Sequence, residues 1–360
     1  MKYIKIFLIV VIVGGLLYLF LKDVDLPVVM NLIKQINPIY PIVFFIGLFL
    51  QYFIRSYRWG LLLKRHKKKI NIFSLYNYTV IGYLINILLP GRLGEPARGI
   101  LLADEQKISR SSGLASILLE RLIDASMIVL IFLASLIFIK GNHSKFLVEL
   151  KHAAFIAAPI FASVFVLFYL VNTGKALPHV EKAILSFAKI FPAKKRTRVA
   201  SFLIDFIKSL RLNLGVWESL RLFFTSIWVW LFYVPFYWFM MQGFEFGSRV
   251  NLVNTIPYFG IIVLGATVPT PGMAGTLDAA SRHGLEKLYG AETNPAAAYT
   301  LLVHFLIIAA VIIPGLIALW TKGLNLKIIK NLDTKTNTDT ESPNINNEDE
   351  ETELGLKSEG

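Results

Sequence analysis

The stretch Leu88-Leu89-Pro90-Gly91-Arg92-Leu93-Gly94-Glu95-Pro96 ends a hydrophobic run of the chain. It places Pro90 and Gly91 where a membrane helix would continue, and it adds an Arg and a Glu. The same pattern, Pro-Gly-x-x-Gly, recurs 181 residues later as Pro271-Gly272-Met273-Ala274-Gly275. Helices broken at matching places in two halves of a membrane protein are the sequence feature that points best to a transport site.

The composition is that of a helical membrane protein. Of the 360 residues, 55% are hydrophobic and 17% are charged, and the apolar residues form several long runs. We therefore predict an all-α polytopic membrane protein. The chain has no cysteine, which excludes disulfides and thiolate metal sites. No other residues have metal-ligand spacing, so we expect neither a metal nor another cofactor.

Charge is distributed unevenly along the chain. The formal net charge is +13, but residues 331–360 hold nine acidic residues and two lysines, which leaves +20 on residues 1–330. We predict a membrane domain over 1–330 and a disordered acidic cytoplasmic tail over 331–360, because the tail has almost no apolar residues. No nucleic-acid motif accompanies the basic charge, so it fits loops that face anionic lipid, and nucleic acid is not an expected partner.

Six apolar segments are long enough to span a membrane as helices. We predict full spans over residues 6–21, 39–54, 111–139, 153–171, 222–241 and 296–320. Two further apolar segments, 73–89 and 252–268, stop at the Pro-Gly breaks, and short helix-compatible pieces over 96–104 and 276–289 follow them. The two halves, about 1–140 and 153–325, are joined by a basic amphipathic connector over 172–219, typical of helices on a membrane surface.

The positions of Lys and Arg indicate what the broken segments are. Seven basic residues lie from Arg55 to Lys69, with Arg58-Trp59 interpreted as interface anchors, and nine lie from Lys175 to Arg211. Both clusters are cytoplasmic only if residues 73–104 enter the membrane and return to the same side. The same rule makes the second broken segment enter from the outside and places both termini in the cytoplasm.

We therefore predict an inverted repeat of two re-entrant helical hairpins. The alternative is a chance similarity between two Gly/Pro loops. The predicted structural breaks are Pro90, Gly91, Gly94, Pro271, Gly272 and Gly275.

Three ionisable residues, Glu120, Arg121 and Asp124, lie within the predicted span 111–139. Each costs about 2.5–3.5 kcal/mol at the bilayer centre, so they must pair, line an aqueous cavity or lie near the interface. Glu120 and Asp124 share a helical face, and Arg121 reaches Asp124 at i+3. If the span begins near Leu122 instead, Glu120 and Arg121 lie at headgroup depth.

Two arginines near the first break suit a lipid phosphate. Arg92 and Arg98 lie close to the start of the returning helix, where free N–H groups favour an anion and Arg adds a bidentate fork. An ion pair of Arg92 with Glu95 or Glu120 is the alternative.

Two polar residues follow the second break. Asp278 either opposes an Arg of the first half or caps the helix that begins at Thr276. His304 is either a packing residue or a proton relay. We include both, with the charged residues of the first half, among the candidate lipid-binding residues.

The sequence holds no HExxH, Walker or GxSxG motif, so we predict no enzymatic activity. The charged and broken segments do, however, resemble a known family. Arg58-Trp59, Gly82, Asn86, the stretch from Leu89 to Glu95 with Arg98, and Glu120-Arg121-Leu122-Ile123-Asp124 match the first-half pattern of the lysylphosphatidylglycerol synthase transmembrane-region (flippase-like, UPF0104) proteins.

The second half matches this family through Pro269, Pro271-Gly272 and Gly275, and the resemblance covers roughly residues 1–325. It departs from the pattern at Asp278, where the family has a Gly-rich run followed by Glu, and at His304, where a second Arg is usual. The resemblance implies an integral inner-membrane protein similar to the flippase half of these synthases, without their aminoacyl-transferase domain.

From these observations we expect a multi-pass protein of the cell (inner) membrane that binds or moves an anionic lipid between leaflets. The expected partner is an anionic phospholipid or a polyprenyl-phosphate-type lipid. A lipid-modifying enzyme as partner and a homo-oligomer both stay open. Two rival functions are an intramembrane enzyme that acts on a lipid phosphate or sugar, and a non-catalytic membrane partner protein.

Overall fold

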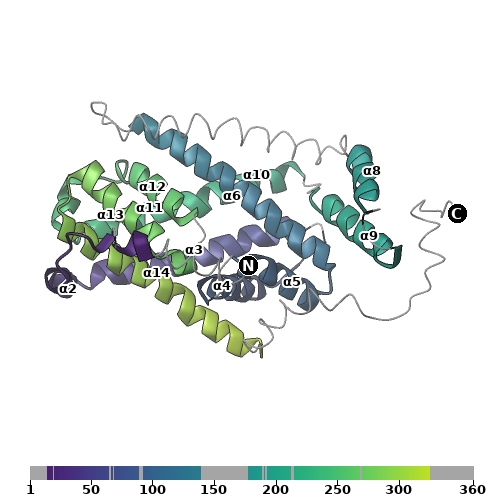
Figure 1. The fold of residues 1–360 in the computed structure, drawn as a ribbon, viewed down its shortest axis with the longest axis horizontal. Coiled ribbons are helices and arrows are strands. Elements are labelled where there is room, and N and C mark those ends of the chain that lie inside the picture. The colour runs from purple at the N-terminus through teal and green to yellow at the C-terminus, as the bar shows by residue number, and fades with distance from the viewer. Residues whose placement is uncertain are drawn as a thin grey trace.

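The structure, a computed structural model, describes residues 14–18, 20–64, 66–67, 69–88, 92–138, 177–188, 190, 193–211, 215–267 and 270–324. Within these residues every regular element is helical (Figure 1), as predicted. The helices are α2 (Leu26–Gln35), α3 (Ile39–Leu63), α4 (Ile72–Leu88), α5 (Gly94–Gln106), α6 (Arg110–Phe138), α8 (Leu177–Ala188), α9 (Ala193–Ser209), α10 (Val216–Leu231), α11 (Tyr233–Met241), α12 (Thr255–Thr267), α13 (Thr276–Tyr289) and α14 (Thr293–Thr321), with short 3₁₀ turns η1 (Glu245–Arg249) and η2 (Pro271–Met273).

Several predicted features fall outside these residues. They are the span 153–171, most of the span 6–21, the break residues Pro90 and Gly91, and the tail 331–360.

Three helical stretches of the described chain are long and apolar enough to cross a membrane: α3, α10 with α11, and α14. They correspond to the predicted spans 39–54, 222–241 and 296–320. The second stretch is interrupted at Phe232 between α10 and α11, where the backbone stays helical and Pro235 has no N–H to donate to the carbonyl of Leu231. The predicted long helix over 111–139 is α6, which spans 29 residues and carries the three ionisable residues in its first half.

Both Pro-Gly segments are followed by a helix that packs back on the one before it, so α4 with α5 and α12 with α13 form two helical hairpins. In the first hairpin the two helices touch at glycine. A methyl group on Gly94 would lie 1.8 Å from the carbonyl oxygen of Gly82, so only glycine fits there. The N–H of Gly94 donates to Asn86 Oδ1 at 2.8 Å, which fixes the start of α5 against the end of α4.

The second hairpin turns through residues with positive φ. Gly272 has a φ of 59°, Met273 of 62° and Gly275 of 79°. Gly275 precedes α13, and its N–H donates to Asp278 Oδ2 at 2.8 Å. The predicted cap by Asp278 is therefore present, through the N–H of the residue before the helix.

The helices are arranged around α3, α4, α6 and α14. α14 packs against α2, α3, α4 and α13, while α6 packs against α3, α5 and α12. In Figure 1 the second hairpin and the pair α8–α9 lie near opposite ends of α6, with α9 in contact with α6. The first hairpin packs both on α14 and on η2 of the second hairpin, so the two hairpins adjoin.

Candidate functional site

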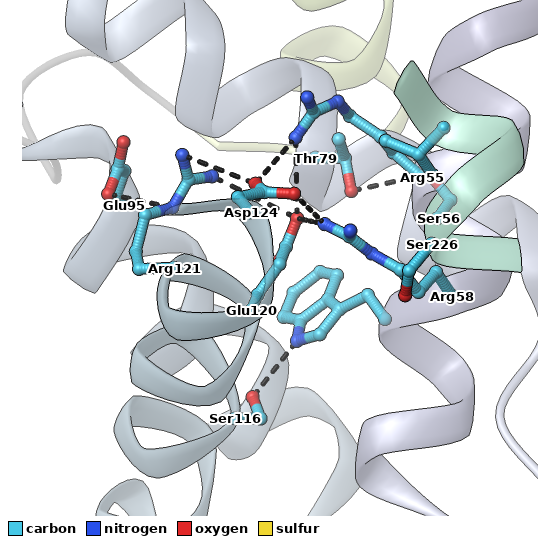
Figure 2. Close-up of polar contacts among 12 residues, drawn as sticks. Arg55, Ser56, Arg58, Thr79, Glu95, Ser116, Glu120, Arg121, Asp124 and Ser226 are labelled. Carbon is cyan, nitrogen blue, oxygen red and sulfur yellow. Dashed lines mark hydrogen bonds and ion pairs between the residues drawn. The ribbon is translucent and has the colours of Figure 1, made fainter. Parts of the chain in front are cut away.

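A buried cluster of charged side chains lies where α3, α5 and α6 meet (Figure 2). Residues three and four apart lie on the same face of a helix, so α6 directs Glu120 and Asp124 toward α3. α3 directs Arg55, Arg58 and Trp59 back toward α6 by the same spacing. Arg58, Trp59 and Glu120 are 0% exposed. The interpretation of Arg58-Trp59 as interface anchors is therefore wrong.

Glu120 is held by two arginines from different helices. Its Oε2 lies 2.5 Å from Arg98 Nη2 of α5, and its Oε1 lies 3.2 Å from Arg58 Nη2 of α3. Arg98 is also 0% exposed, and its guanidinium lies over the indole ring of Trp59 at 4.7 Å from the centroid. Trp59 in turn donates from Nε1 to Ser116 Oγ at 2.9 Å. A buried carboxylate needs such compensation, and here α3 and α5 supply it.

Asp124, one turn further along α6, anchors the other arginines. Its carboxylate lies 2.7 Å from Arg58 Nη2 and 3.0 Å from Arg55 Nη1. It also accepts a hydrogen bond of 3.1 Å from Trp230 Nε1 of α10. The guanidinium of Arg55 lies over the Trp230 ring, 5.1 Å from its centroid, which orients Arg55 from a second side.

Arg121 is held less completely than the other arginines. Its Nε lies 3.2 Å from Glu95 Oε2, and its Nη1 lies 3.6 Å from Asp124 Oδ2. The side chain is 30% exposed. Its buried Nε and Nη2 atoms make no hydrogen bond of good geometry to any described residue. Arg58 also has two such atoms, so the feature that distinguishes Arg121 is its exposure, which leaves part of its guanidinium open to an additional acceptor.

Arg121 faces a cavity of about 280 Å³ that lies between the two hairpins. Its wall also includes Arg55, Arg92, Glu95 and Asp124. Apolar and aromatic side chains from both halves of the chain form the rest of the wall, among them Leu48, Tyr83, Trp230, Tyr233, Phe259 and Val311. The cavity therefore has a charged part on the side of the first hairpin and a larger apolar part.

The charge of the site is positive. Arg55, Arg58, Arg98 and Arg121 are paired with only three carboxylates, those of Glu95, Glu120 and Asp124. This leaves one positive charge in the cluster beside the cavity. Taking charges out of water is costly unless they are compensated, so an anion in the cavity would complete the balance.

Arg92 joins the two hairpins. Its Nη2 donates to the carbonyl oxygens of Ala266 at 2.7 Å and Thr267 at 3.0 Å, at the end of α12. The last carbonyls of a helix have no partner within the helix and carry partial negative charge. Arg92 satisfies two of them, and the structure shows neither predicted ion pair, with Glu95 or with Glu120, among the described residues.

Asp278 and His304 pair with each other and do not line the cavity. His304 Nδ1 lies 2.6 Å from Asp278 Oδ1, and Nε2 lies 2.8 Å from the carbonyl oxygen of Gly272. The two residues come from α13 and α14. Asp278 thus both caps α13 and binds His304, and it contacts no arginine of the first half within the described chain.

A further ion pair lies at the end of α5, outside the three apolar spans. Glu105 accepts hydrogen bonds from Ser74, from Tyr78 at 2.7 Å and from Lys322 Nζ at 2.6 Å. Burial alone would raise the pKa of Glu105, but these donors outweigh it and lower the pKa to about 2. This contact ties the end of α14 to the first hairpin.

The structure brings Arg92, Glu95, Arg121 and Asp124 of the predicted site residues into one cavity wall, with Arg98 and Glu120 buried behind them. Asp278 and His304 form a separate pair. Sequence reasoning missed Arg55 and Trp230. Arg55 was counted with a basic loop, although its spacing of three and four residues to Arg58 and Trp59 already indicated one helical face.

The fold and the site together define a polytopic helical membrane protein with a charged cavity between two helical hairpins. The chain belongs to the family described as the lysylphosphatidylglycerol synthase TM region, which matches residues 6–315. The resemblance seen in the motifs is thus confirmed. The chain is also 23% identical over 265 residues to a UPF0104 membrane protein of Methanocaldococcus jannaschii, which covers 71% of this chain and 76% of that protein. No solved structure matches it.

Proposed function

We propose that this protein binds the phosphate of an anionic lipid in the cavity between its hairpins and moves the lipid between the leaflets of the cell membrane. The observation that carries the proposal is Arg121, whose partly exposed guanidinium borders the cavity in a cluster that has one more arginine than carboxylates. Arginine binds phosphate through two parallel N–H donors, so a phosphate is a suitable acceptor.

The shape and lining of the cavity support a headgroup as the ligand. A volume of about 280 Å³ lies just below the roughly 300–1,000 Å³ that is typical of ligand sites. Such a cavity holds a headgroup and the first part of an acyl chain. The charged part provides contacts for the phosphate, and the apolar part suits the chain. An anionic phospholipid or a polyprenyl-phosphate-type lipid meets both requirements.

The membrane arrangement that we propose has six full spans and two re-entrant hairpins, related as inverted halves, with both termini in the cytoplasm. The helices α4 and α12 have 17 and 13 residues. At 1.5 Å per residue these extend about 25 Å and about 20 Å, less than the roughly 30 Å of a hydrocarbon core. The bonds from Arg92 to the end of α12 join the two hairpins near their tips, as expected for hairpins that enter from opposite faces.

The test is leaflet exchange in reconstituted vesicles. Purified protein is inserted into vesicles that contain a fluorescent phosphatidylglycerol, and a membrane-impermeant quencher reports the fraction of label in the outer leaflet over time. We expect exchange with the wild-type protein and loss of exchange with Arg121→Ala. Arg121→Lys should retain only a small part of the rate, because an ammonium lacks the planar fork of Arg.

The matched control is Arg110→Ala. This arginine lies about three helical turns before Arg121 on α6 and pairs with Asp104 at the surface. It should exchange lipid as the wild type does. Equal elution profiles and thermal midpoints show that the variants are folded. Unchanged lipid exchange with Arg121→Ala would contradict the proposed role of Arg121 in lipid binding.

We also expect the lipid to leave the protein chemically unchanged. Glu120 and Asp124, the carboxylates that a lipid-modifying enzyme would use as acid or base, are each held by at least two arginines. Carboxylates whose oxygens are bound by arginines in this way suit an anchor better than a proton donor. Mass spectrometry of the vesicle lipids before and after exchange tests this, and a new lipid species would favour the enzyme instead.

A further inference from the structure

A buried histidine–carboxylate pair lies beneath the tip of the second hairpin. Asp278 is 2% exposed and His304 is 7% exposed. The tip itself, residues 270–275, supplies Thr270, Gly272 and Met273 to the cavity wall. His304 holds this tip directly, through the 2.8 Å contact between its Nε2 and the carbonyl oxygen of Gly272.

The two contacts of His304 fix the number of protons in the pair. The carbonyl of Gly272 only accepts, so Nε2 must carry a proton. The contact of 2.6 Å between Nδ1 and Asp278 Oδ1 requires another proton, on either the ring or the carboxyl group. The pair thus holds one proton more than a neutral imidazole beside a carboxylate. When that proton leaves, the remaining one stays between Nδ1 and the carboxylate, and the contact with Gly272 loses its donor.

We propose that Asp278 and His304 form a proton-binding site that latches the tip of the second hairpin, and that lipid exchange is coupled to the release of this proton. The coupling rests on the proposed function, whereas the latch does not. The protonated pair holds the tip in the position that the structure shows. Loss of the proton, as the pH rises, frees residues 270–275 and changes the wall of the cavity.

Within the described chain, no other ionisable side chain bonds to the pair. α4, α12 and the turn η2 carry no charged side chain, and His304 is the only charged or titratable group of α14 apart from Tyr299. Arg282 of α13 binds Glu286 and backbone carbonyls near the N-terminus. The other ionisable groups on the elements packed against α13 and α14 are Lys34 of α2, Arg55 and Arg58 of α3, His283 and Lys287 of α13, and the tyrosines. Of these, the arginines are bound to α6 and His283 is exposed.

The two halves of the chain differ in this respect. In the first half, the helix after the break and the long helix behind it are joined by Arg98 and Glu120. In the second half, Asp278 and His304 occupy the corresponding helices. Arginine stays charged at every physiological pH, while histidine changes charge between about pH 5 and 8. The second hairpin is therefore the one that responds to protons.

The chain has no cysteine, so one introduced thiol reports on the tip alone. In Ala274→Cys we would measure the rate of modification by a water-soluble maleimide from pH 5.5 to 8.5, corrected for the thiolate fraction of a free cysteine. We expect the corrected rate to rise with pH, by up to about tenfold per pH unit, since one proton is linked to the opening. In the same variant with His304→Arg, which keeps its charge and donors, the corrected rate should be flat.

A corrected rate that is the same at every pH in both backgrounds overturns the latch. A second measurement uses the wild-type protein and so does not depend on the folding of variants. Nitrogen-15 NMR of labelled histidine, assigned with His304→Gln, reports the protonation of each ring nitrogen. We expect Nε2 of His304 to be protonated at low pH and unprotonated at high pH. An Nε2 that keeps its proton from pH 5 to 9 also overturns the proposal.

Leaflet exchange separates this inference from the function on which its coupling rests. If both hold, exchange by the wild type changes with pH and exchange by His304→Arg does not. A wild-type exchange rate that is independent of pH removes the coupling and leaves the lipid assignment standing. No exchange at any pH, with a latch that titrates, counts against the lipid assignment and the coupling but not against the proton site.

Discussion

At the scale of single residues, the seven charges of the buried cluster of α3, α5 and α6 differ in how completely they are compensated. Glu120 is enclosed, with Arg58 and Arg98 on either side and no exposed surface. Arg121 is only partly enclosed. Full enclosure suits a residue that fixes the others in place, and partial enclosure suits one that binds a ligand. We therefore expect substitutions at these neighbouring positions to have different effects.

Glu120→Gln should mainly reduce stability. The substitution keeps the shape of the side chain but leaves Arg58 and Arg98 without their carboxylate, and breaking one partner of a buried ion pair typically costs about 3–5 kcal/mol. Thermal unfolding in detergent, followed by tryptophan fluorescence, should show a midpoint several degrees below that of the wild type. Asp104→Asn, which breaks an exposed ion pair on α5 worth about 0–1 kcal/mol, is the control. Equal midpoints for the two variants would contradict this account.

At the scale of elements, the first hairpin depends on the close approach of α4 and α5. The start of α5 lies against the backbone of α4 at Gly82, and Asn86 binds its first N–H. Lys322 and Glu105 then tie the end of α5 to the end of α14. The hairpin is thus fixed at both ends, by backbone contact at one and by an ion pair at the other.

Gly94→Ala should displace α5. Its methyl group would lie 1.8 Å from a backbone oxygen that cannot rotate away, so the helix must move. Overpacking of this kind lowers the free energy of unfolding by about 1–3 kcal/mol. Gly15→Ala, where a methyl group meets nothing within 4 Å, is the control. We expect Gly94→Ala to lower both the unfolding midpoint and the exchange rate, and a variant as stable and active as Gly15→Ala would show that the hairpin tolerates a wider spacing.

The contact between Glu105 and Lys322 should make the stability of the folded protein fall at low pH. The pKa of Glu105 is lowered from 4.5 to about 2, so the folded state binds its proton less readily than the unfolded state does. The stabilisation is complete above pH 4.5 and is lost as the pH falls toward 2. Unfolding midpoints measured from pH 6 downward should converge for the wild type and Glu105→Gln below pH 4.5. A constant difference between the two proteins would assign the stabilisation to something other than this carboxylate.

At the scale of the whole molecule, the site is built from both halves of the chain. The cavity wall combines residues of the first hairpin and α6 with residues of α10, α11, α12 and α14. The proposed lipid site therefore needs both halves of the chain folded together. Rocking of one half against the other would change which face of this cavity is accessible.

Deletion of residues 331–360 separates transport from partner binding. We expect the truncated protein to exchange lipid at the rate of the full chain, because every residue that the proposed lipid site uses precedes residue 331. The vesicle assay used for Arg121→Ala measures this directly. If exchange disappears while the truncated protein remains folded and inserted, the tail has a role in transport itself.

Much of this architecture was predictable from local patterns. The short helix over 276–289 and the long helices α6 and α14 follow from where apolar runs stop and start, and the structure places them as predicted. The ion pairs of α6 followed from the cost of isolated charges in a membrane. The extension of α3 through Arg55 and Arg58 was hidden, because the same residues also satisfy the rule for cytoplasmic loops.

Contacts between distant helices were less predictable. The sequence leaves the roles of Asp278 and His304 open, because their pairing depends on how α13 packs against α14. The aromatic anchor Trp230 lies 106 residues from its partner Asp124. Spacing along one helix says nothing about such pairs, since they depend on the packing of helices that are far apart in the sequence.

The bonds from Arg92 to Ala266 and Thr267 have a genetic consequence. The acceptors are main-chain oxygens, which every amino acid supplies equally. A substitution at position 266 or 267 therefore neither removes this contact nor restores it in an Arg92 variant through a new side chain. A screen for second-site suppressors of Arg92→Ala should return few changes at the positions that Arg92 touches. The most direct link between the two hairpins would thus leave almost no trace in mutational covariation.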